Sequence, residues 1–103
     1  MNYPELQPAI VRITATVPAE RIILFGSRAR GNAHSDSDYD LLVVVPAEDK
    51  TLATYKKLHK ALLGLGLDIE VVLASPEDLK NYQNAWMTIF PAALHEGQVL
   101  YAA

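Results

Sequence analysis

The spacing of apolar residues along the chain predicts a series of amphipathic helices. Leu6, Ile10 and Ile13 recur at helical spacing before Pro18 closes the first segment. The clearest helix, Thr51–Leu63, ends before Gly64 and Gly66, and its apolar stripe comprises Leu52, Tyr55, Leu58 or His59, and Leu62. The predicted helices cover Pro4–Thr16, Thr51–Leu63, a segment that begins at Ser75-Pro76, and Ala85–His95, which Pro91 interrupts.

Three short apolar runs between these helices predict strands. Arg21–Phe25 is β-branched and apolar and ends abruptly at Gly26. Asp40–Val45 is apolar at nearly every position, which is typical of a strand buried on both faces. Leu67–Leu73 alternates in its first half, and a turn with a short extended piece ends the chain. The order of elements predicts a small α/β domain in which helices cover a short sheet.

Length and composition narrow the function classes. The 103 residues allow a single domain, and the 50% apolar content allows a packed core. A net charge of −3 argues against a general nucleic-acid-binding protein, and the absence of cysteine excludes disulfides and cysteine–zinc sites. Neither a bilayer-spanning stretch nor a signal peptide is recognisable, so we expect a soluble, cytoplasmic protein without membrane association.

The turn after the first predicted strand is a candidate phosphate-binding element. Gly26 allows the backbone to approach a ligand closely, and the hydroxyl of Ser27 can donate to a phosphate oxygen. Arg28 and Arg30 add positive charge with bidentate reach. A glycine–serine turn alone is more often structural. Its interpretation as a phosphate-binding turn therefore depends on the residues that follow it.

A cluster of aspartates follows this turn and runs into the central strand. Asp36, Asp38 and Asp40 stand at alternate positions, where their charges repel one another unless a cation lies between them. Asp38 and Asp40 point to the same side of an extended segment, whereas Tyr39 points away into packing. Oxygen ligands favour magnesium, manganese or calcium, and a pair of metals held in this way suits phosphoryl or nucleotidyl transfer.

A calcium-binding EF-hand loop is the sharpest alternative reading of these aspartates. The rest of the loop does not fit, because Leu41 stands where glycine is required and Ala47 where glutamate is required. The loop would also run through the best predicted strand. We therefore reject the EF-hand, while a polar loop with chance acidic residues remains the simplest alternative.

The two features together are far more specific than either alone. Gly26-Ser27, ten residues, then Asp38-Tyr39-Asp40 resembles the signature of DNA polymerase β-like nucleotidyltransferases. The stretch GSRARGNAHSDSDYDLLVVV resembles the minimal nucleotidyltransferase family, and the likeness extends through LDIEVVLASPEDLKNY to HEGQVLYAA. It implies one minimal nucleotidyltransferase domain over residues 1–103, with a short mixed sheet covered by helices.

The resemblance also implies roles for individual residues. Gly26 and Ser27 would hold the triphosphate of ATP, and Asp38 and Asp40 would bind Mg²⁺, with two ions expected. A later strand supplies a third acid, for which Glu70 is favoured and Asp68 remains the alternative. Members of the family usually carry aspartate there, so Glu70 is a departure. Asp36 is expected to be solvated or to lie outside the metal's direct ligands.

Members of that family are often paired with HEPN-domain toxins. The resemblance therefore implies an antitoxin that moves AMP from ATP to a tyrosine of its partner. Only some thirty residues follow Glu70, which agrees with an acceptor presented by another protein. An antitoxin that neutralises its partner by binding alone is the second hypothesis, and transfer to RNA or a metabolite is the third.

Overall fold

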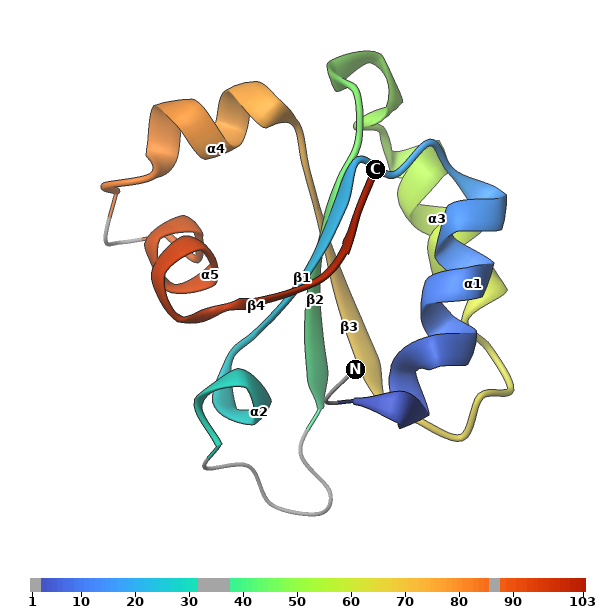
Figure 1. The fold of residues 1–103 in the computed structure, drawn as a ribbon. Coiled ribbons are helices and arrows are strands. Elements are labelled where there is room, and N and C mark those ends of the chain that lie inside the picture. The colour runs from blue at the N-terminus through green and yellow to red at the C-terminus, as the bar shows by residue number, and fades with distance from the viewer. Residues whose placement is uncertain (1–2, 32–37, 86–87) are drawn as a thin grey trace.

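The computed structural model describes residues 3–31, 38–85 and 88–103. Figure 1 shows a central sheet with helices on both sides. The strands are β1 (Arg21–Phe25), β2 (Tyr39–Val44), β3 (Ile69–Ala74) and β4 (Gln98–Ala102). The helices are α1 (Gln7–Thr16), α2 (Ser27–Arg30), α3 (Leu52–Ala61), α4 (Pro76–Tyr82) and α5 (Phe90–Glu96), with 3₁₀ turns η1 (Pro4–Leu6) and η2 (Ala47–Asp49).

The four strands form one mixed sheet in the order β3-β2-β1-β4. β2 runs parallel to β3, while β1 is antiparallel to both β2 and β4. The register aligns Phe25 with Asp40 and Asp40 with Glu70. The end of β1 and the starts of β2 and β3 therefore meet at one end of the sheet, beside α2, at the bottom of Figure 1.

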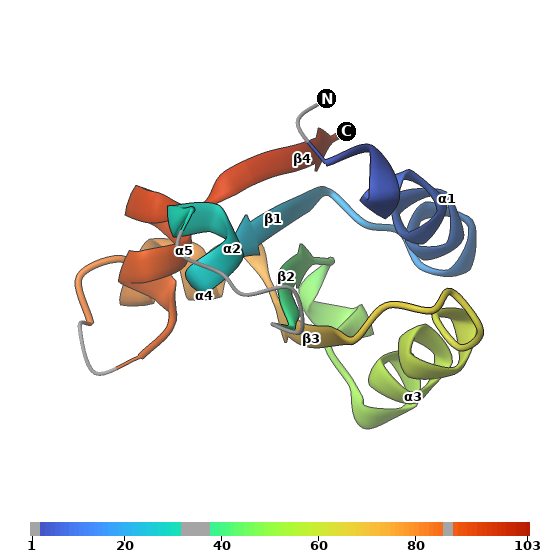
Figure 2. The ribbon, with the colours of Figure 1, turned by 90° about the horizontal axis from the view of Figure 1, so that it is seen from below.

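Two hydrophobic clusters cover the two faces of the sheet. Along β2, Tyr39, Leu41 and Val43 belong to the cluster shared with α1 and α3, whereas Leu42 and Val44 belong to the cluster shared with α4 and α5. Figure 2 shows the two helix layers on opposite sides of the strands. Alternate residues of each strand thus face different helices, as the pleat of a sheet requires.

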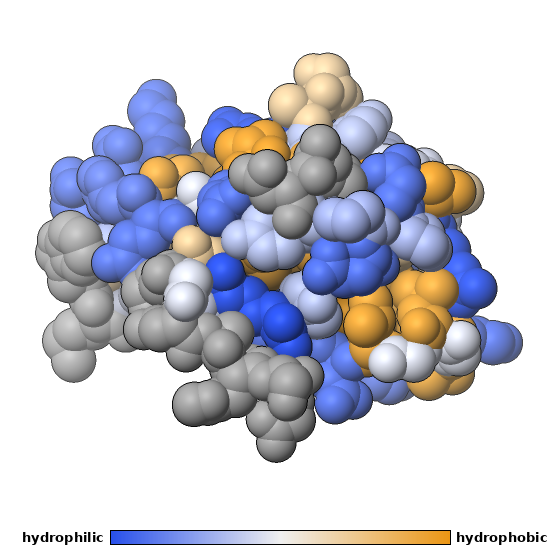
Figure 3. All heavy atoms as spheres, turned by 60° about the horizontal axis from the view of Figure 1, so that its bottom comes forward, coloured by the Kyte–Doolittle hydropathy of each residue, from blue (hydrophilic) through white to orange (hydrophobic). Residues whose placement is uncertain are grey.

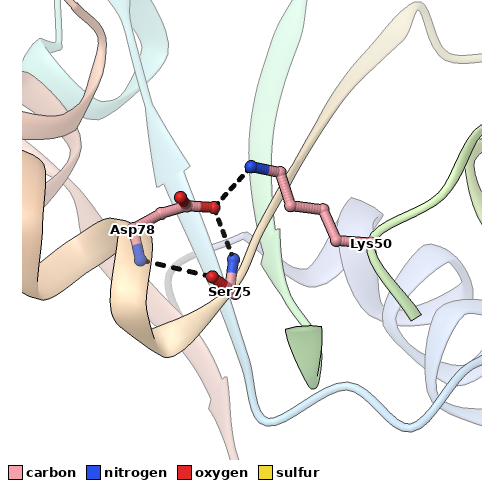
Figure 4. A network of polar contacts seen from close by, with 3 residues as sticks. All are labelled: Lys50, Ser75 and Asp78. Atoms are coloured by element: carbon pink, nitrogen blue, oxygen red, sulfur yellow. Dashed lines mark hydrogen bonds and ion pairs between the residues drawn. The ribbon is translucent and has the colours of Figure 1, made fainter. Parts of the chain in front are cut away.

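The N-terminus of α4 is fixed by a capping box and an ion pair (Figure 4). The Ser75 hydroxyl accepts from the Asp78 backbone N–H, and the Asp78 carboxylate accepts from the Ser75 N–H. Lys50 Nζ approaches Asp78 Oδ2 to 2.6 Å and connects α4 to the segment before α3. This confirms the helix start predicted at Ser75-Pro76.

Two expectations from the sequence need correction. Pro91 occupies the first turn of α5 instead of interrupting a longer helix, because proline is well accommodated where the backbone N–H needs no partner. Leu52 is 67% exposed and does not belong to the buried side of α3, which Leu58 forms together with the C-cap residue Leu62. The short extended piece predicted at the C-terminus is confirmed as the edge strand β4, which pairs with β1.

The remaining elements lie close to their predicted positions. Thr51 is the N-cap of α3, its side chain accepting from Thr54 N–H, and Glu70 is exposed where Val71 is buried, as the predicted alternation requires. Among the described residues, no helix combines the length and the apolar character needed to cross a bilayer.

Candidate functional site

The glycine–serine turn lies where β1 ends beside β2. Gly26 has φ 80° and ψ −158°, a backbone conformation that essentially only glycine adopts, and Ser27 opens the four-residue helix α2. A β-carbon at Gly26 would overlap Asp40 Oδ2. Two separate reasons therefore favour glycine at position 26: its dihedral angles, and the close approach of its backbone to the Asp40 carboxylate.

Contacts from both ends of the chain hold α2 in place. Tyr3 donates its hydroxyl hydrogen to the carbonyl oxygen of Arg28 at 3.1 Å. Gln98 Nε2 donates to the Tyr3 hydroxyl at 3.0 Å and to the carbonyl oxygen of Ala29 at 3.3 Å. Nothing in the spacing of the sequence indicates these contacts, because Tyr3 and Gln98 are 95 positions apart.

Arg28 is engaged in a contact that its predicted role did not anticipate. Its guanidinium lies 4.0 Å from the centre of the Tyr39 ring, a cation–π arrangement. Tyr39 is only 5% exposed, which confirms that it points into packing, and its hydroxyl donates to Glu5 Oε2 at 3.1 Å. Burial, followed by the hydrogen bond and charge of Glu5, raises the pKa of Tyr39 above its ordinary value of 10.0.

Of the two arginines predicted to bind phosphate, only Arg28 has a side chain that the structure describes. Tyr39 faces the cluster of α1 and α3, opposite to the side on which Asp40 lies against Gly26. A guanidinium stacked on an aromatic ring keeps N–H groups along its edge that can donate hydrogen bonds, so this contact does not exclude phosphate binding by Arg28. Arg30 ends α2, and its side chain lies outside the described part of the structure, as do His34 and Asp36.

Four carboxylates meet at the same end of the sheet. Asp38 is exposed just before β2, and Asp40 is half-buried as the second residue of that strand. Glu70 is the register partner of Asp40 on the parallel neighbour β3. Asp38, Asp68 and Glu70, together with Ile69, line a polar hollow of about 190 Å³. Figure 3, turned to bring this end of the molecule forward, shows hydrophilic residues spread across it.

Asp68 and Glu70 differ in how firmly the sheet positions them. The carbonyl oxygen of Asp68 accepts the Tyr39 N–H at 2.8 Å, which fixes the entry into β3. Glu70 lies within β3, and its Cα is aligned with that of Asp40. Both side chains are exposed, so both can reach into the hollow.

The donor set suits a hard cation, although the ligands are not assembled. Carboxylate oxygens are the ligands that Mg²⁺ prefers, and Asp38, Asp40 and Glu70 are the residues that would hold it. Within residues 3–31, 38–85 and 88–103, no three His, Cys, Asp or Glu side chains are arranged to hold a metal ion. Exposed carboxylates on a solvent-facing hollow can turn toward a cation without disturbing the core.

Other polar side chains lie on the surface. Lys56, Lys57 and Lys60 are exposed on α3 and form part of its solvated face. His59 is exposed and stacks on Tyr55 with ring centres 6.4 Å apart, and His95 is exposed near the end of α5.

Comparison with solved structures places the fold among known proteins. The toxin–antitoxin crystallised with AMP-PNP superposes with a TM-score of 0.67 at 22% identity, covering 100% of this chain and 75% of that one. A crystal structure described as a putative nucleotidyltransferase from Sulfolobus solfataricus gives 0.66 at 16% identity over 95% and 78%. A mutant of the toxin–antitoxin MntA-HpeT gives 0.63 at 20% identity over 91% and 70%.

Sequence comparison identifies the family. The chain is 39% identical over 83 residues to the Methanocaldococcus jannaschii protein named Putative protein adenylyltransferase MJ0604, covering 80% of this chain and 78% of the relative. The family described as Nucleotidyltransferase domain matches residues 12–92, a range that contains the Gly26 turn and all four carboxylates. The small α/β fold with its mixed sheet agrees with this match. The chain is therefore a nucleotidyltransferase and belongs to the nucleotidyltransferase domain family.

Proposed function

We propose that this chain is an antitoxin that transfers AMP from ATP, with Mg²⁺, to a tyrosine hydroxyl of a HEPN-domain toxin. One observation carries the nucleotide half of this proposal: the backbone of Gly26 lies against the carboxylate of Asp40, and Glu70 is aligned with Asp40 on the next strand. A phosphate-binding turn is thus adjacent to the oxygen ligands of a cation. Both are needed where a polyphosphate is cleaved.

Each residue has a separate part in the proposed reaction. Gly26 and Ser27 bind the β- and γ-phosphates through backbone N–H groups and the serine hydroxyl. Asp38 and Asp40 would hold Mg²⁺, which when bound would stabilise the negative charge of the departing pyrophosphate. Glu70, or Asp68 in its place, accepts the proton of the attacking hydroxyl. Tyr3 and Gln98 keep the α2 turn in position while phosphate charge develops.

The acceptor half of the proposal is supported by the relatives. The archaeal relative is named as a protein adenylyltransferase, and two of the structural neighbours are toxin–antitoxin assemblies, one with AMP-PNP. The net charge of −3 disfavours binding of a polyanionic acceptor such as RNA. A hydroxyl on a protein side chain needs no such binding.

A binding-only antitoxin is the alternative that two observations favour. The described residues contain no assembled set of three metal ligands, and Glu70 replaces the aspartate usual in the family that the sequence resembles. A chain with a weakened site could still neutralise a toxin by covering its active surface. The two functions predict different chemistry on the partner.

Intact mass spectrometry of the partner separates these functions. The purified chain is incubated with ATP, Mg²⁺ and the product of the adjacent gene, and the partner is weighed. We expect mass increments of AMP that vanish when Asp38→Ala and Asp40→Ala are introduced together. A stable complex with no increment under any nucleotide would establish the binding-only function instead.

A further inference from the structure

The helix layer formed by α1 and α3 carries charge of one sign only. The chain as a whole has 12 acidic residues and 9 lysine and arginine residues. Four of these basic residues and none of the acidic ones stand on α1 and α3. An acidic molecule therefore presents a positive surface on this side of its sheet. The four residues are Arg12 on α1 and Lys56, Lys57 and Lys60 on α3.

The residues of α3 separate into a buried side and an exposed side. Thr54, Leu58 and the C-cap residue Leu62 are buried toward the sheet. On the opposite side, exposed residues follow one another in steps of three or four positions, the spacing that keeps side chains on one side of a helix. We call these exposed residues the α3 face: Leu52, Lys56, Lys57, His59, Lys60 and, just after the helix, Leu63.

The α3 face combines positive charge with exposed apolar surface. Its three lysines form no ion pair within the described residues, in contrast to Lys50, which pairs with Asp78. Leu52 is 67% exposed and Leu63 is 61% exposed, at the two ends of the face. Lysines alone would keep the helix solvated, whereas leucines at both ends add apolar area of the kind that a partner covers.

A cavity opens at the C-terminal end of the α3 face. Its volume is about 180 Å³, and it lies between α3 and β3. His59 and Leu63 of the face line it, together with Leu67, Ile69 and Val71 on the other wall. Figure 3 shows hydrophobic residues grouped beside hydrophilic ones on this side of the molecule. A small apolar hollow beside charged residues suits a single anchoring side chain of a protein partner.

We propose that the α3 face docks an acidic surface of the partner toxin, with an apolar side chain of the toxin entering the cavity. This inference rests on the proposed function, because that function supplies the partner. Charge selects the occupant, since clustered lysines attract carboxylates and speed the encounter with them. RNA is also negatively charged, but an apolar cavity and two leucines offer no contact to a phosphate backbone.

Docking at the α3 face would leave the candidate active site uncovered. Tyr39 faces the cluster of α1 and α3, so Asp40, the next residue of β2, faces the other side of the sheet. Glu70 likewise alternates with Ile69, which packs against the same cluster as Tyr39. Figure 2 shows the two helix layers on opposite sides. The cavity and the carboxylate hollow share Asp68 and Ile69, so the two surfaces meet at the start of β3.

Charge reversal on α3 tests the electrostatic part of this surface. Lys56→Glu/Lys60→Glu changes two exposed residues that stand four positions apart on the helix. Arg21→Glu/Lys80→Glu is the matched control, because it changes the net charge equally at two other exposed positions. Lys80 lies on α4, and Arg21 alternates with Ile22, so both stand on the far side of the sheet from α3.

Removal of an exposed leucine tests the apolar part. Leu63→Ser shortens a side chain of the cavity rim, while its backbone carbonyl still accepts from Arg12. Val99→Ser is the matched control, because Val99 is 57% exposed on β4 and does not line the cavity. Every substituted position is exposed, so none of the changes should unfold the protein, and thermal unfolding checks this.

Binding of the adjacent-gene product is measured by isothermal titration calorimetry. We expect Kd to rise at least about tenfold in Lys56→Glu/Lys60→Glu and at least about threefold in Leu63→Ser, with both controls within about twofold of the wild type. The wild-type Kd should also rise as NaCl increases from about 0.05 M to about 0.5 M, because salt screens the charges. In AMP transfer, KM for the partner should rise in the two α3 variants, while kcat and KM for ATP stay unchanged.

The outcomes distinguish this surface from the function on which it rests. Partner affinity that is unchanged in both α3 variants, or equally reduced in the controls, would overturn the docking surface and leave AMP transfer standing. A labelled single-stranded RNA that binds the wild type but not Lys56→Glu/Lys60→Glu, with partner affinity unchanged, would overturn it in favour of RNA. A chain that binds its partner through this face and transfers no AMP would refute the proposed function and keep the docking surface.

Discussion

Gly26 and Asp40 lie so close together that no side chain fits between them. The residue before Gly26, Phe25, is the register partner of Asp40, and the Gly26 backbone then turns across the Asp40 carboxylate. An acidic group placed against a phosphate-binding turn would repel an anion if it were not neutralised. We propose that a cation shares the site with the phosphates, which would offset the repulsion between them and the Asp40 carboxylate.

Substitution of Gly26 by alanine should abolish activity out of proportion to its effect on stability. The added methyl group displaces Asp40 and strains the backbone by about 1–3 kcal/mol. Gly64→Ala is the control, because Gly64 also has positive φ, 83°, but its β-carbon would meet nothing within 4 Å. We expect Gly64→Ala to lower stability by about 1–2 kcal/mol and keep AMP transfer. Equal activity losses in the two variants would contradict the account.

Replacement of the two β3 acids should identify the one that takes part in the reaction. Glu70→Gln is expected to lower kcat by about 10²–10⁴-fold, the usual contribution of a general base, with partner affinity nearly unchanged. Asp68→Asn should cost less than tenfold, because the backbone carbonyl of Asp68, which pairs with Tyr39, remains in place. Single-turnover kinetics measure both. The reverse order would assign the role to Asp68.

Loosening the support of α2 should weaken nucleotide binding more than chemistry. Tyr3→Phe removes the hydrogen bond to the Arg28 carbonyl, and Gln98→Leu removes those to Tyr3 and Ala29. We expect KM for ATP to rise about three- to tenfold in each, since one hydrogen bond contributes about 0.5–1.5 kcal/mol. Tyr82→Phe on α4 is the control. Unchanged KM in both variants would show that these contacts serve folding alone.

The Lys50–Asp78 contact should make stability depend on pH. Burial of the Asp78 carboxyl raises its pKa, but the hydrogen bonds from Lys50 and from Ser75 N–H outweigh burial, so the pKa lies below its ordinary value of 3.8. A lowered folded-state pKa contributes stability that is fully present above the unfolded-state value and is lost as the pH falls below it.

Asp78→Asn measures this contribution. The Lys50 side chain is 44% exposed and screened, so the variant should be only about 0.5–1 kcal/mol less stable than the wild type at pH 7. The difference should shrink toward zero as the pH approaches about 2. Urea unfolding at several pH values measures it, and Glu77→Gln, a change at the next exposed acid of the same helix, is the control. A difference that stays constant with pH would assign the effect to lost packing.

Much of the fold could be predicted because local signals agreed with one another. These signals are local properties of the sequence: the apolar run of β2, the residues Thr51 and Ser75 at the starts of α3 and α4, and the alternation that exposes Glu70. The mixed sheet that the family resemblance implies is confirmed, whereas the strand order depends on long-range packing, which no short pattern encodes. The sequence alone does not fix the role of Pro91, because a proline can either end a helix or occupy the first turn of the next one.

Within the candidate site, the motif residues can be recognised in the sequence, but the residues that hold α2 in place cannot. Gly26, Asp38 and Asp40 stand within fifteen positions of one another, so their spacing is visible in the sequence. Tyr3 and Gln98 come together only because β4 pairs beside β1. Phosphate binding by Arg28 stays a prediction, and the stacking of its guanidinium on Tyr39 is a further contact that the motif does not indicate.

The central claim is tested most directly by following the two ends of the triphosphate separately. The chain and its partner are incubated with Mg²⁺ and ATP labelled at either the α- or the γ-phosphate, and label on the partner is counted. Our account predicts stable label from the α-phosphate and none from the γ-phosphate, with the α-label lost in Asp40→Ala. Label from the γ-phosphate would indicate a kinase, and absence of label from either position would contradict transfer altogether.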